Sequence, residues 1–251
     1  MKRIDSVKNP QVKGWKKLHT KKERDKTGLF IVEGFHLVEE ALKHKENIKE
    51  VIISDEVEIP SAWNVDDVSI VWVKPDVMKA ISDTETPQGA AAICYQSVMT
   101  ELPSVQKVLL LDAIQDPGNL GTIIRTAEAA GIELVVIGEG SVDVYNSKVI
   151  RSTQGAIFHF PILKGNLGEV IAQLKEQNVA IYGTSLQNGK PYQEVQTASS
   201  FALMVGNEGN GVREEFLQQT DANLYIPIYG KSESLNVAVA AGILVYYLGG
   251  R

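Results

Sequence analysis

The stretch DPGNLGTIIRTAEAAG, residues 116–131, decides how this chain folds. The apolar run 107–114 before it predicts a buried strand, and Asp-Pro-Gly predicts a turn, because proline presets φ and glycine accepts strained geometry. Asn119 stands where a helix N-cap belongs, and Gly131 stands where the helix would stop before a second apolar strand at 133–138. The stretch therefore predicts a helix between two strands.

Arg125 is the residue of this helix that most needs an explanation. It falls on the predicted inner face, among small and apolar residues at helical spacing (Gly121, Ile124, Thr126, Ala129 and Ala130). A charge near an apolar face needs partners, because burying it alone is very costly. A structural ion pair or a side chain that reaches back to solvent would serve as well as a functional role.

Two later segments favour function. In ALMVGNEGNGV, residues 202–212, an apolar strand runs into a loop whose glycines surround Asn207 and Glu208, and such a loop lets backbone amides approach a ligand closely. In IPIYGKSESLNVAVAAGILVYYL, residues 226–248, Ser232 or Ser234 can cap a long apolar helix. The glycine spacing does not fit a dinucleotide fingerprint, no Gly-Lys-Ser/Thr closes a phosphate loop, and the apolar run is too short to cross a bilayer.

Together, the three segments resemble the SpoU/TrmH family of RNA ribose 2′-O-methyltransferases, within the SPOUT superfamily. The first family motif matches Asn119, Gly121 and Arg125, the second matches 206–211 with Glu208 inside it, and the third matches the Ser-Leu-Asn-Val run 234–237. RSTQGAIFHFP, residues 151–161, is a further family-like stretch. The resemblance covers about 145 residues, from 107 to the C-terminus, in the correct order.

The resemblance implies an α/β fold with a SPOUT-type trefoil-knotted parallel-sheet domain at 106–251. It also implies S-adenosyl-L-methionine as cofactor, no metal, and a homodimer whose interface helps to form the cofactor site. The expected substrate is a ribose 2′-hydroxyl of structured RNA, ribosomal RNA above all. The family's catalytic positions correspond to Arg125, Asn119, Glu208, Ser234 and Asn236, and its cofactor-binding positions to Thr184, Gly206, Ile226 and Leu235.

Several of these residues also have ordinary structural explanations. Asn119 and Ser234 are both good helix caps, and Ile226 and Leu235 could belong to the core. Asn236, which we expect one turn inside the last helix, needs a polar partner if it is buried. Arg125 stays protonated near neutral pH, so we expect it to stabilise developing negative charge rather than to act as a general base.

The first hundred residues read as a separate small α/β unit. Its pattern of strands and helices resembles the ribosomal-protein-like substrate-binding domain found in many family members, which suggests an RNA-binding domain at 1–96 and a linker at 97–105. Residues 1–26 carry ten Lys and Arg against three Asp and Glu, although the whole chain has a net charge of −6. Such a basic segment on an acidic body is typical of docking to RNA phosphates.

The RNA-contact candidates are Lys13, Lys16, Lys17, Lys21, Lys22, Arg24 and Glu33. The alternative for the basic cluster is a solvated face of one helix, since Val12, Trp15 and Leu18 recur at helical spacing. Glu33, in the family-like FIVEG element, could lie near RNA or could instead favour a helix start through the macrodipole.

Composition bears on metal binding and on localisation. Cys94 is the single cysteine, and the four histidines lack metal-ligand spacing. The N-terminus has no apolar signal segment, so we expect a cytoplasmic protein without a membrane partner. Three rival functions stay open: a non-catalytic RNA-binding or ribosome assembly factor that keeps the fold, a transfer-RNA ribose methyltransferase, and a base methyltransferase.

Overall fold

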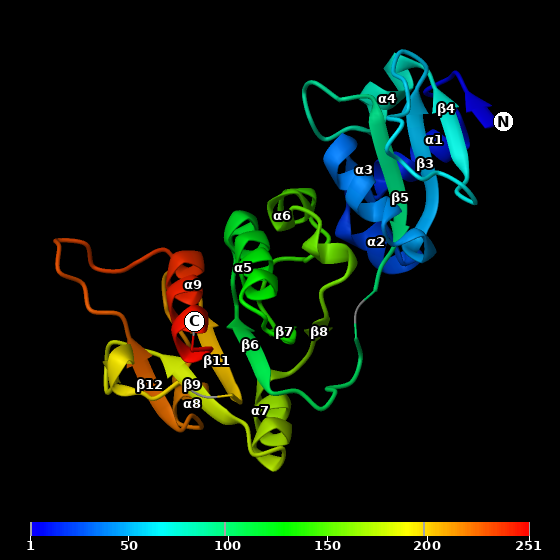
Figure 1. The fold of residues 1–251 in the computed structure, drawn as a ribbon. Helices are drawn as coiled ribbons and strands as arrows, with labels where there is room; N and C mark the ends of the chain where they lie inside the picture. Colours follow the sequence, from blue (N-terminus) through cyan, green and yellow to red (C-terminus); the bar gives the residue numbers. More distant parts are fainter. Residues whose placement is uncertain (1, 98, 198, 251) are drawn as a thin grey trace. The chain divides into compact units, whose positions relative to one another are not determined.

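The computed structural model describes residues 2–97, 99–197 and 199–250, and it divides the chain into two compact units (Figure 1). Unit 1 comprises Met1–Ser97 and Asp143–His159, and unit 2 comprises Val98–Val142 and Phe160–Arg251. The sequence places residues 143–159 in the C-terminal domain, whereas the structure packs them within unit 1. Residue 98 of the predicted linker lies outside the described residues.

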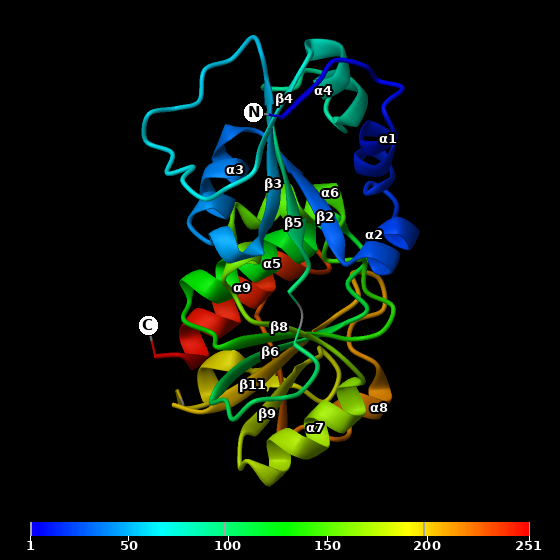
Figure 2. The ribbon, with the colours of Figure 1, turned by 90° about the vertical axis from the view of Figure 1, so that its right-hand side faces the viewer.

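Unit 1 is built on a five-stranded sheet in the order β1-β4-β3-β5-β2. β1, β4 and β3 run parallel, and β5 is antiparallel to both β3 and β2. In Figure 2, α1 and α4 lie on one side of this sheet and α3 lies on the other. The strands are β1 (Lys2–Ile4), β2 (Leu29–Glu33), β3 (Ile48–Ser54), β4 (Ile70–Val73) and β5 (Ala90–Tyr95). The helices are α1 (Pro10–Lys17), α2 (Lys21–Thr27), α3 (Phe35–Leu42), α4 (Pro75–Ile81) and α6 (Ser147–Thr153), with 3₁₀ turns at Lys45–Asn47 and Ala156–Phe158.

The basic segment forms two helices, where the sequence predicts one. The Asn9 side chain caps α1 by accepting from the Gln11 N–H at 2.8 Å, and the Thr20 hydroxyl caps α2 by accepting from the Glu23 N–H at 3.4 Å. Because a capping residue leaves helical geometry, Thr20 interrupts the helical path after α1. Val12, Trp15 and Leu18 are buried, as their spacing predicts.

Residues 143–159 are tied into unit 1 by aromatic, polar and glycine contacts. The Tyr145 ring lies 4.6 Å from that of Phe30, and its hydroxyl accepts from the backbone N–H of Ser97 at 2.8 Å. Gly155 has φ +102°, and a Cβ there would lie 2.6 Å from Cγ of Glu40. This close approach gives a physical reason for glycine in the family-like stretch 151–161.

Unit 2 is built on a seven-stranded sheet in the order β10-β12-β9-β11-β6-β7-β8, with every pairing parallel. β6 and β11 lie at its centre and are apolar along nearly their whole length, as parallel strands covered on both faces must be. The strands are β6 (Lys107–Asp112), β7 (Leu134–Ile137), β8 (Ile162–Lys164), β9 (Ala180–Thr184), β10 (Lys190–Pro191), β11 (Phe201–Gly206) and β12 (Ala222–Tyr225).

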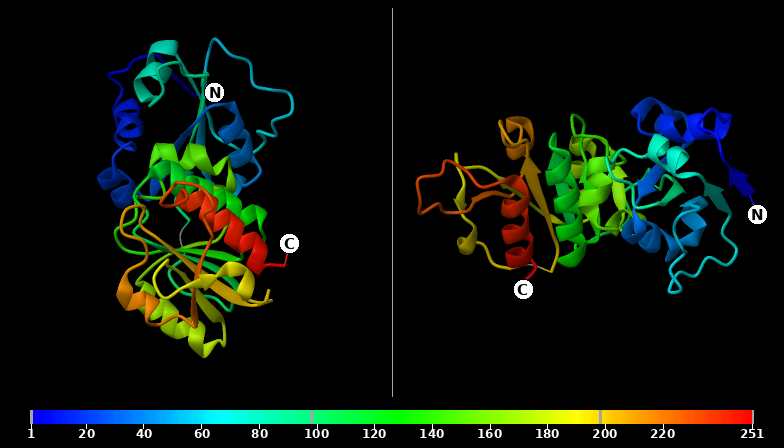
Figure 3. Two further views of the ribbon diagram at one scale, coloured as in Figure 1. Left: turned by 90° about the vertical axis from the view of Figure 1, so that its left-hand side faces the viewer. Right: turned by 90° about the horizontal axis from the view of Figure 1, so that it is seen from above.

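The helices of unit 2 cover both faces of its sheet. α5 and α9 lie side by side on one face, and α7 and α8 lie on the opposite face (Figures 2 and 3). These helices span α5 (Pro117–Ala129), α7 (Leu167–Glu176), α8 (Glu214–Leu217) and α9 (Val237–Leu248), with a 3₁₀ turn at Tyr192–Glu194. Among the described residues, no helix combines the length and apolarity that a bilayer crossing requires.

The parallel arrangement determines where a ligand site can form. Gly206 at the end of β11 pairs in register with Asp112 at the end of β6, and Thr184 at the end of β9 pairs with Leu224 of β12. The loops that follow these four strands therefore meet at one edge of the sheet. In open α/β sheets, this carboxyl edge is where ligands bind.

Candidate active site

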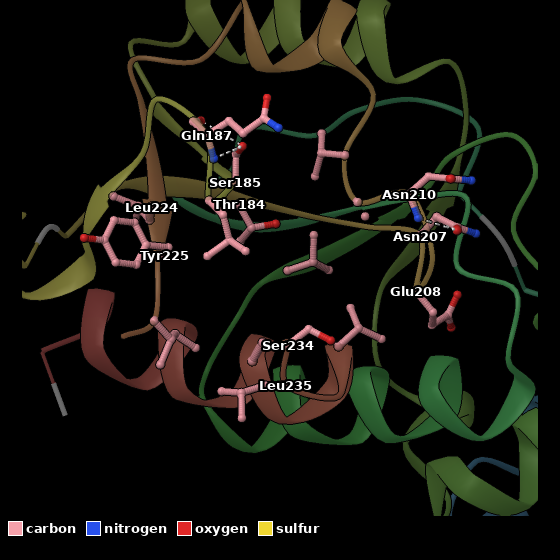
Figure 4. Close-up of a pocket in the computed structure, with 18 of the residues that line it drawn as sticks. Thr184, Ser185, Gln187, Asn207, Glu208, Asn210, Leu224, Tyr225, Ser234 and Leu235 are labelled. Carbon is pink, nitrogen blue, oxygen red and sulfur yellow. Dashed lines mark hydrogen bonds between the residues drawn. The ribbon is translucent and has the colours of Figure 1, made fainter. Parts of the chain in front are cut away.

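A cavity of about 710 Å³ opens at the carboxyl ends of β9, β11 and β12, a size typical of small-molecule sites. Thr184 and Tyr225 lie toward one end of it and Asn207 and Glu208 toward the other (Figure 4). The structure brings together all four residues predicted to bind cofactor, since each lines this cavity: Thr184, Gly206, Ile226 and Leu235.

The glycine-rich loop after β11 is folded tightly on itself. Asn207 and Gly211 exchange both backbone hydrogen bonds, and the Asn207 side chain accepts from the N–H groups of Gly209 and Asn210. A Cβ on Gly206 would lie 2.1 Å from the backbone nitrogen of Val212. Glycine is therefore required at the strand end, where the returning loop passes close to the cavity wall.

Three predicted catalytic residues form one chain of hydrogen bonds. Asn236 donates from Nδ2 to Oδ1 of Asn119 at 2.8 Å, and Asn119 donates from Nδ2 to Oε1 of Glu208 at 3.1 Å. The Glu208 carboxylate also accepts from the backbone N–H groups of Gln115 and Asp116, each at 3.2 Å. Partial burial would by itself raise the pKa of Glu208, but these hydrogen bonds outweigh burial and lower it.

The capping residues differ from those that the sequence predicts. Asp116, rather than Asn119, caps α5, because its carboxylate accepts from the Asn119 N–H at 2.8 Å. Asn236, rather than a serine, caps α9, because its Oδ1 accepts from the N–H groups of Ala238 and Val239. Asn119 therefore lies in the first turn of α5 and does not cap it. Its side-chain amide links Asn236 to Glu208. Ser234 is exposed and lines the cavity.

The prediction that Arg125 lies on the inner face of its helix is wrong. The inner face of α5 consists of Leu120, Gly121, Ile123, Ile124 and Ala127, whereas Arg125 is exposed. Its neighbour Thr126 faces α9: a Cβ added at Gly242 would lie 3.4 Å from the Thr126 methyl group. Arg125 is absent from the described residues that line the cavity of its own chain. An exposed guanidinium avoids the desolvation cost that an inner position would carry.

The RNA-contact candidates of unit 1 separate into two groups. Lys13, Lys16, Lys17, Lys21 and Lys22 are exposed. Arg24 is only 4% exposed, and it donates from Nε and Nη2 to Asp143 at 3.1 and 2.7 Å and from Nη1 to the Leu18 carbonyl. Arg24 is therefore held in a buried ion pair with Asp143, unlike the five lysines, and its guanidinium does not present its charge at the surface.

Glu33 lies at the end of β2, as predicted, and holds a neighbouring loop. It accepts from the hydroxyl of Ser82 and from the backbone N–H of Asp83, the latter at 2.8 Å. The Glu33 carboxylate therefore fixes the segment that follows α4. Nothing in the local sequence around Glu33 predicts this role.

A pair of residues at the carboxyl edge was not predicted from the sequence. Asp112 is 1% exposed and accepts from Nε of Arg213 at 2.9 Å and from the Arg213 backbone N–H at 2.8 Å. The hydrogen bond to Asp112 raises the pKa of Arg213 more than its partial burial lowers it. An aspartate directly after an apolar run, as in VLLLD at 108–112, is the signal that could have revealed the pair.

Comparison with known proteins identifies the family. The family model described as "SpoU rRNA Methylase family" matches residues 106–246, and the "MRM3-like substrate binding domain" matches residues 9–92. The chain belongs to the SpoU rRNA methylase family. Membership confirms the resemblance inferred from the three motifs, and with it the methyltransferase class.

Relatives of this SpoU methylase match it over almost its whole length. It is 54% identical, over 100% of both chains, to the Bacillus subtilis 23S rRNA (guanosine(2553)-2′-O)-methyltransferase RlmP. The AdoMet-bound rRNA methyltransferase of Sinorhizobium meliloti is 31% identical with a TM-score of 0.88, covering 98% of this chain and 97% of that one. AviRb of Streptomyces viridochromogenes, solved with AdoMet, shares the fold at 24% identity with a TM-score of 0.86, covering 97% of this chain and 98% of that one. These likenesses confirm the α/β fold class and its parallel sheet.

Proposed function

We propose that this protein transfers the methyl group of S-adenosyl-L-methionine to a ribose 2′-oxygen of 23S ribosomal RNA. Two observations carry the proposal: the motifs at 206–211 and 234–237 line one cavity at the carboxyl edge of the sheet, and Asn119 of the remaining motif is hydrogen-bonded to Glu208 and Asn236 in that lining. Because the relative that is 54% identical over its whole length is named for guanosine 2553, we propose the equivalent guanosine as the target. With a ribosomal substrate, we propose that the protein works in the cytoplasm.

The cavity fits the proposed cofactor in size and in lining. S-adenosyl-L-methionine supplies a methyl group activated on a sulfonium. Backbone groups at Thr184, Gly206 and Ile226 would hold it at the strand ends, with the apolar side chain of Leu235 beside them. The backbone of Gly206 lies close to that of Gly211 and Val212, with no side chain between them. This close approach suits a site that recognises its ligand through main-chain atoms. We propose these four residues as the cofactor-binding set.

The remaining motif residues would arrange the ribose for attack. Arg125 is exposed and permanently protonated, so it can hold the target phosphate and stabilise negative charge on the 2′-oxygen. The chain from Asn236 through Asn119 to Glu208 fixes polar groups next to the cavity, and Ser234 adds a hydroxyl at its wall. Positioning supplies most of the rate enhancement in such a transfer.

We also propose a homodimer formed through α9 and the adjoining surface of α5. Val239 and Tyr246 of α9 are 53% and 40% exposed, and Leu235, just before α9, is 39% exposed. Exposed large apolar side chains that gather on one surface are typical of an interaction site. A second copy seated there would cover this surface and bring its own Arg125 close to the interface. The trefoil knot remains a prediction from family membership.

In unit 1, the exposed lysines at positions 13, 16, 17, 21 and 22 would bind RNA phosphates. We propose that residues 1–96 dock the substrate, that residues 97–105 connect the domains, and that residues 106–251 carry the chemistry. The match of the substrate-binding family model to residues 9–92 supports the first assignment.

Transfer of tritium from labelled cofactor tests the proposal. Ribosomal RNA from cells that lack this gene should accept label, and complete nuclease digestion should leave a resistant dinucleotide, because a 2′-O-methyl group blocks cleavage of the adjacent bond. Label in mononucleotides would favour a base methyltransferase, label only in transfer RNA would favour a transfer-RNA enzyme, and binding without label would favour an assembly factor. Sedimentation of the free protein as a monomer at micromolar concentration would contradict the dimer.

A further inference from the structure

The end of β6 holds the far end of the glycine-rich loop. Asp112 binds Arg213 three times: through Nε at 2.9 Å, through Nη2 at 2.9 Å and through the backbone N–H at 2.8 Å. Arg213 follows the loop directly, and its guanidinium also lies 4.4 Å from the centre of the Phe216 ring. A buried carboxylate is costly unless hydrogen bonds satisfy it, and here both of its oxygens are used.

The sheet register explains what this ion pair constrains. Asp112 pairs directly with Gly206, the residue where the loop begins. The Asp112 backbone therefore lies beside the start of the loop, and its side chain binds Arg213, where the loop ends. One residue thus keeps the entry and the exit of the loop together. The loop between them lines the cavity from Gly206 to Val212.

Ala113 provides a second tie to the same loop. It has φ +56°, a left-handed conformation that residues other than glycine, asparagine and aspartate seldom adopt. In this conformation its carbonyl accepts from Nδ2 of Asn207 at 3.0 Å. Together with the bonds from the N–H groups of Gln115 and Asp116 to Glu208, the segment 112–116 binds the loop at three successive places.

We propose that Asp112 and Arg213 are positioning residues, which hold the glycine-rich loop in the conformation that binds the methyl donor. The inference rests on the proposed function and deepens it. Neither residue is among the described residues that line the cavity, so they act through the loop and not by contact with the donor. Loss of the pair releases the end of the loop at Arg213, which lowers donor affinity and leaves the rate at saturating donor nearly unchanged.

Arg213→Gln tests the inference, because this side chain is 47% exposed and the backbone N–H of residue 213 can still donate to Asp112. Calorimetric titration of the purified protein with S-adenosyl-L-methionine should give at least a tenfold higher Kd, and hydrogen exchange at residues 207–211 should become faster. Arg213→Lys, which keeps the charge but loses the paired donors, should fall in between. Glu215→Gln is the matched control, since Glu215 binds the same guanidinium at 3.2 Å but does not touch β6. It should bind donor as the wild type does.

Steady-state kinetics complete the test. The KM for donor should rise in parallel with Kd, while kcat and the KM for RNA stay within about twofold of the wild type. A variant that loses thermal stability but binds donor normally would overturn the inference, as would a loss of kcat with unchanged Kd. If the wild type itself fails to bind the donor, the proposed function fails as well, and this outcome is separate from a failure of the variant alone.

Discussion

At the carboxyl edge of the seven-stranded sheet, side chains from three distant segments are joined by hydrogen bonds, whereas the lysines of α1 and α2 are exposed and follow one another along the chain. The first arrangement suits chemistry, because reacting groups must be held in fixed positions. The second suits a polyanion, because phosphates are bound mainly by charge. Arg24 and Arg125 reverse the sequence-based expectation, since the arginine predicted to meet RNA is buried and the one predicted on an inner face is exposed.

The largest effect should come from breaking the buried pair in unit 1. Arg24→Ala leaves Asp143 without its guanidinium partner, and loss of one member of a buried ion pair costs about 3–5 kcal/mol. Tryptophan fluorescence during denaturant unfolding measures this loss of stability in unit 1. All three tryptophans of the chain lie in that unit: Trp15, Trp63 and Trp72.

Lys21→Ala is the control for this prediction, since its ion pair with Asp25 is exposed and should contribute less than about 1 kcal/mol. Arg24→Met combined with Asp143→Leu should recover most of the lost stability. Equal stability of Arg24→Ala and Lys21→Ala would mean that Arg24 is not a structural residue.

Arg125→Lys should have the next largest effect, on turnover. Loss of a group that stabilises developing negative charge typically lowers kcat by about 10²–10³-fold. Donor affinity should not change, because Arg125 does not line the cavity of its own chain within the described residues. Single-turnover methylation and calorimetry measure the two quantities, with the exposed Thr122→Ala on the same helix as control. A normal rate for Arg125→Lys would contradict its role.

Asn119→Ala should have a smaller effect, because it removes the link between Asn236 and Glu208 but leaves the backbone bonds to Glu208 in place. A hydrogen bond to a charged group is worth about 1.5–3 kcal/mol, so we expect kcat to fall by roughly ten- to a hundredfold. Because Asp116 is the cap, α5 should remain as stable as in the wild type. A lower melting temperature with unchanged kcat would show that Asn119 is purely structural.

The lysines should have the smallest effect per residue. Replacing Lys13, Lys16 and Lys17 with alanine should weaken RNA binding and make log K less dependent on log salt, by about 0.7–0.9 for each phosphate that is no longer neutralised. Lys21→Ala should matter less, since Lys21 is already paired with Asp25. Binding measured from low to moderate salt gives the slope. A slope unchanged in the triple variant would mean that RNA binds elsewhere on the molecule.

The sequence predicted what depends on local pattern. The strand at 107–112, the helix through 117–129 with Gly131 after it, and the glycine-rich loop all follow from hydrophobic runs and from turn and glycine chemistry. The identity of the caps could not be predicted, because Asp116 and Asn119 are both good capping residues and only the backbone path selects one of them.

Contacts between residues far apart in the chain could not be predicted from the sequence either. The partner of Arg24 lies 119 positions away, and the partner of Asp112 lies 101 positions away. Nothing in the local sequence joins either pair. The strand β1 likewise depends on its pairing with β4, which no short window of sequence contains.

Mapping of ribose methylation along 23S ribosomal RNA tests the proposed activity most directly. RNA from cells with the gene, without it, and with Arg125→Lys in its place should be compared by resistance of each linkage to alkaline hydrolysis. We predict one protected position, at the guanosine equivalent to that of the Bacillus subtilis relative, present only with the wild-type gene. Identical maps with and without the gene would contradict the proposed function.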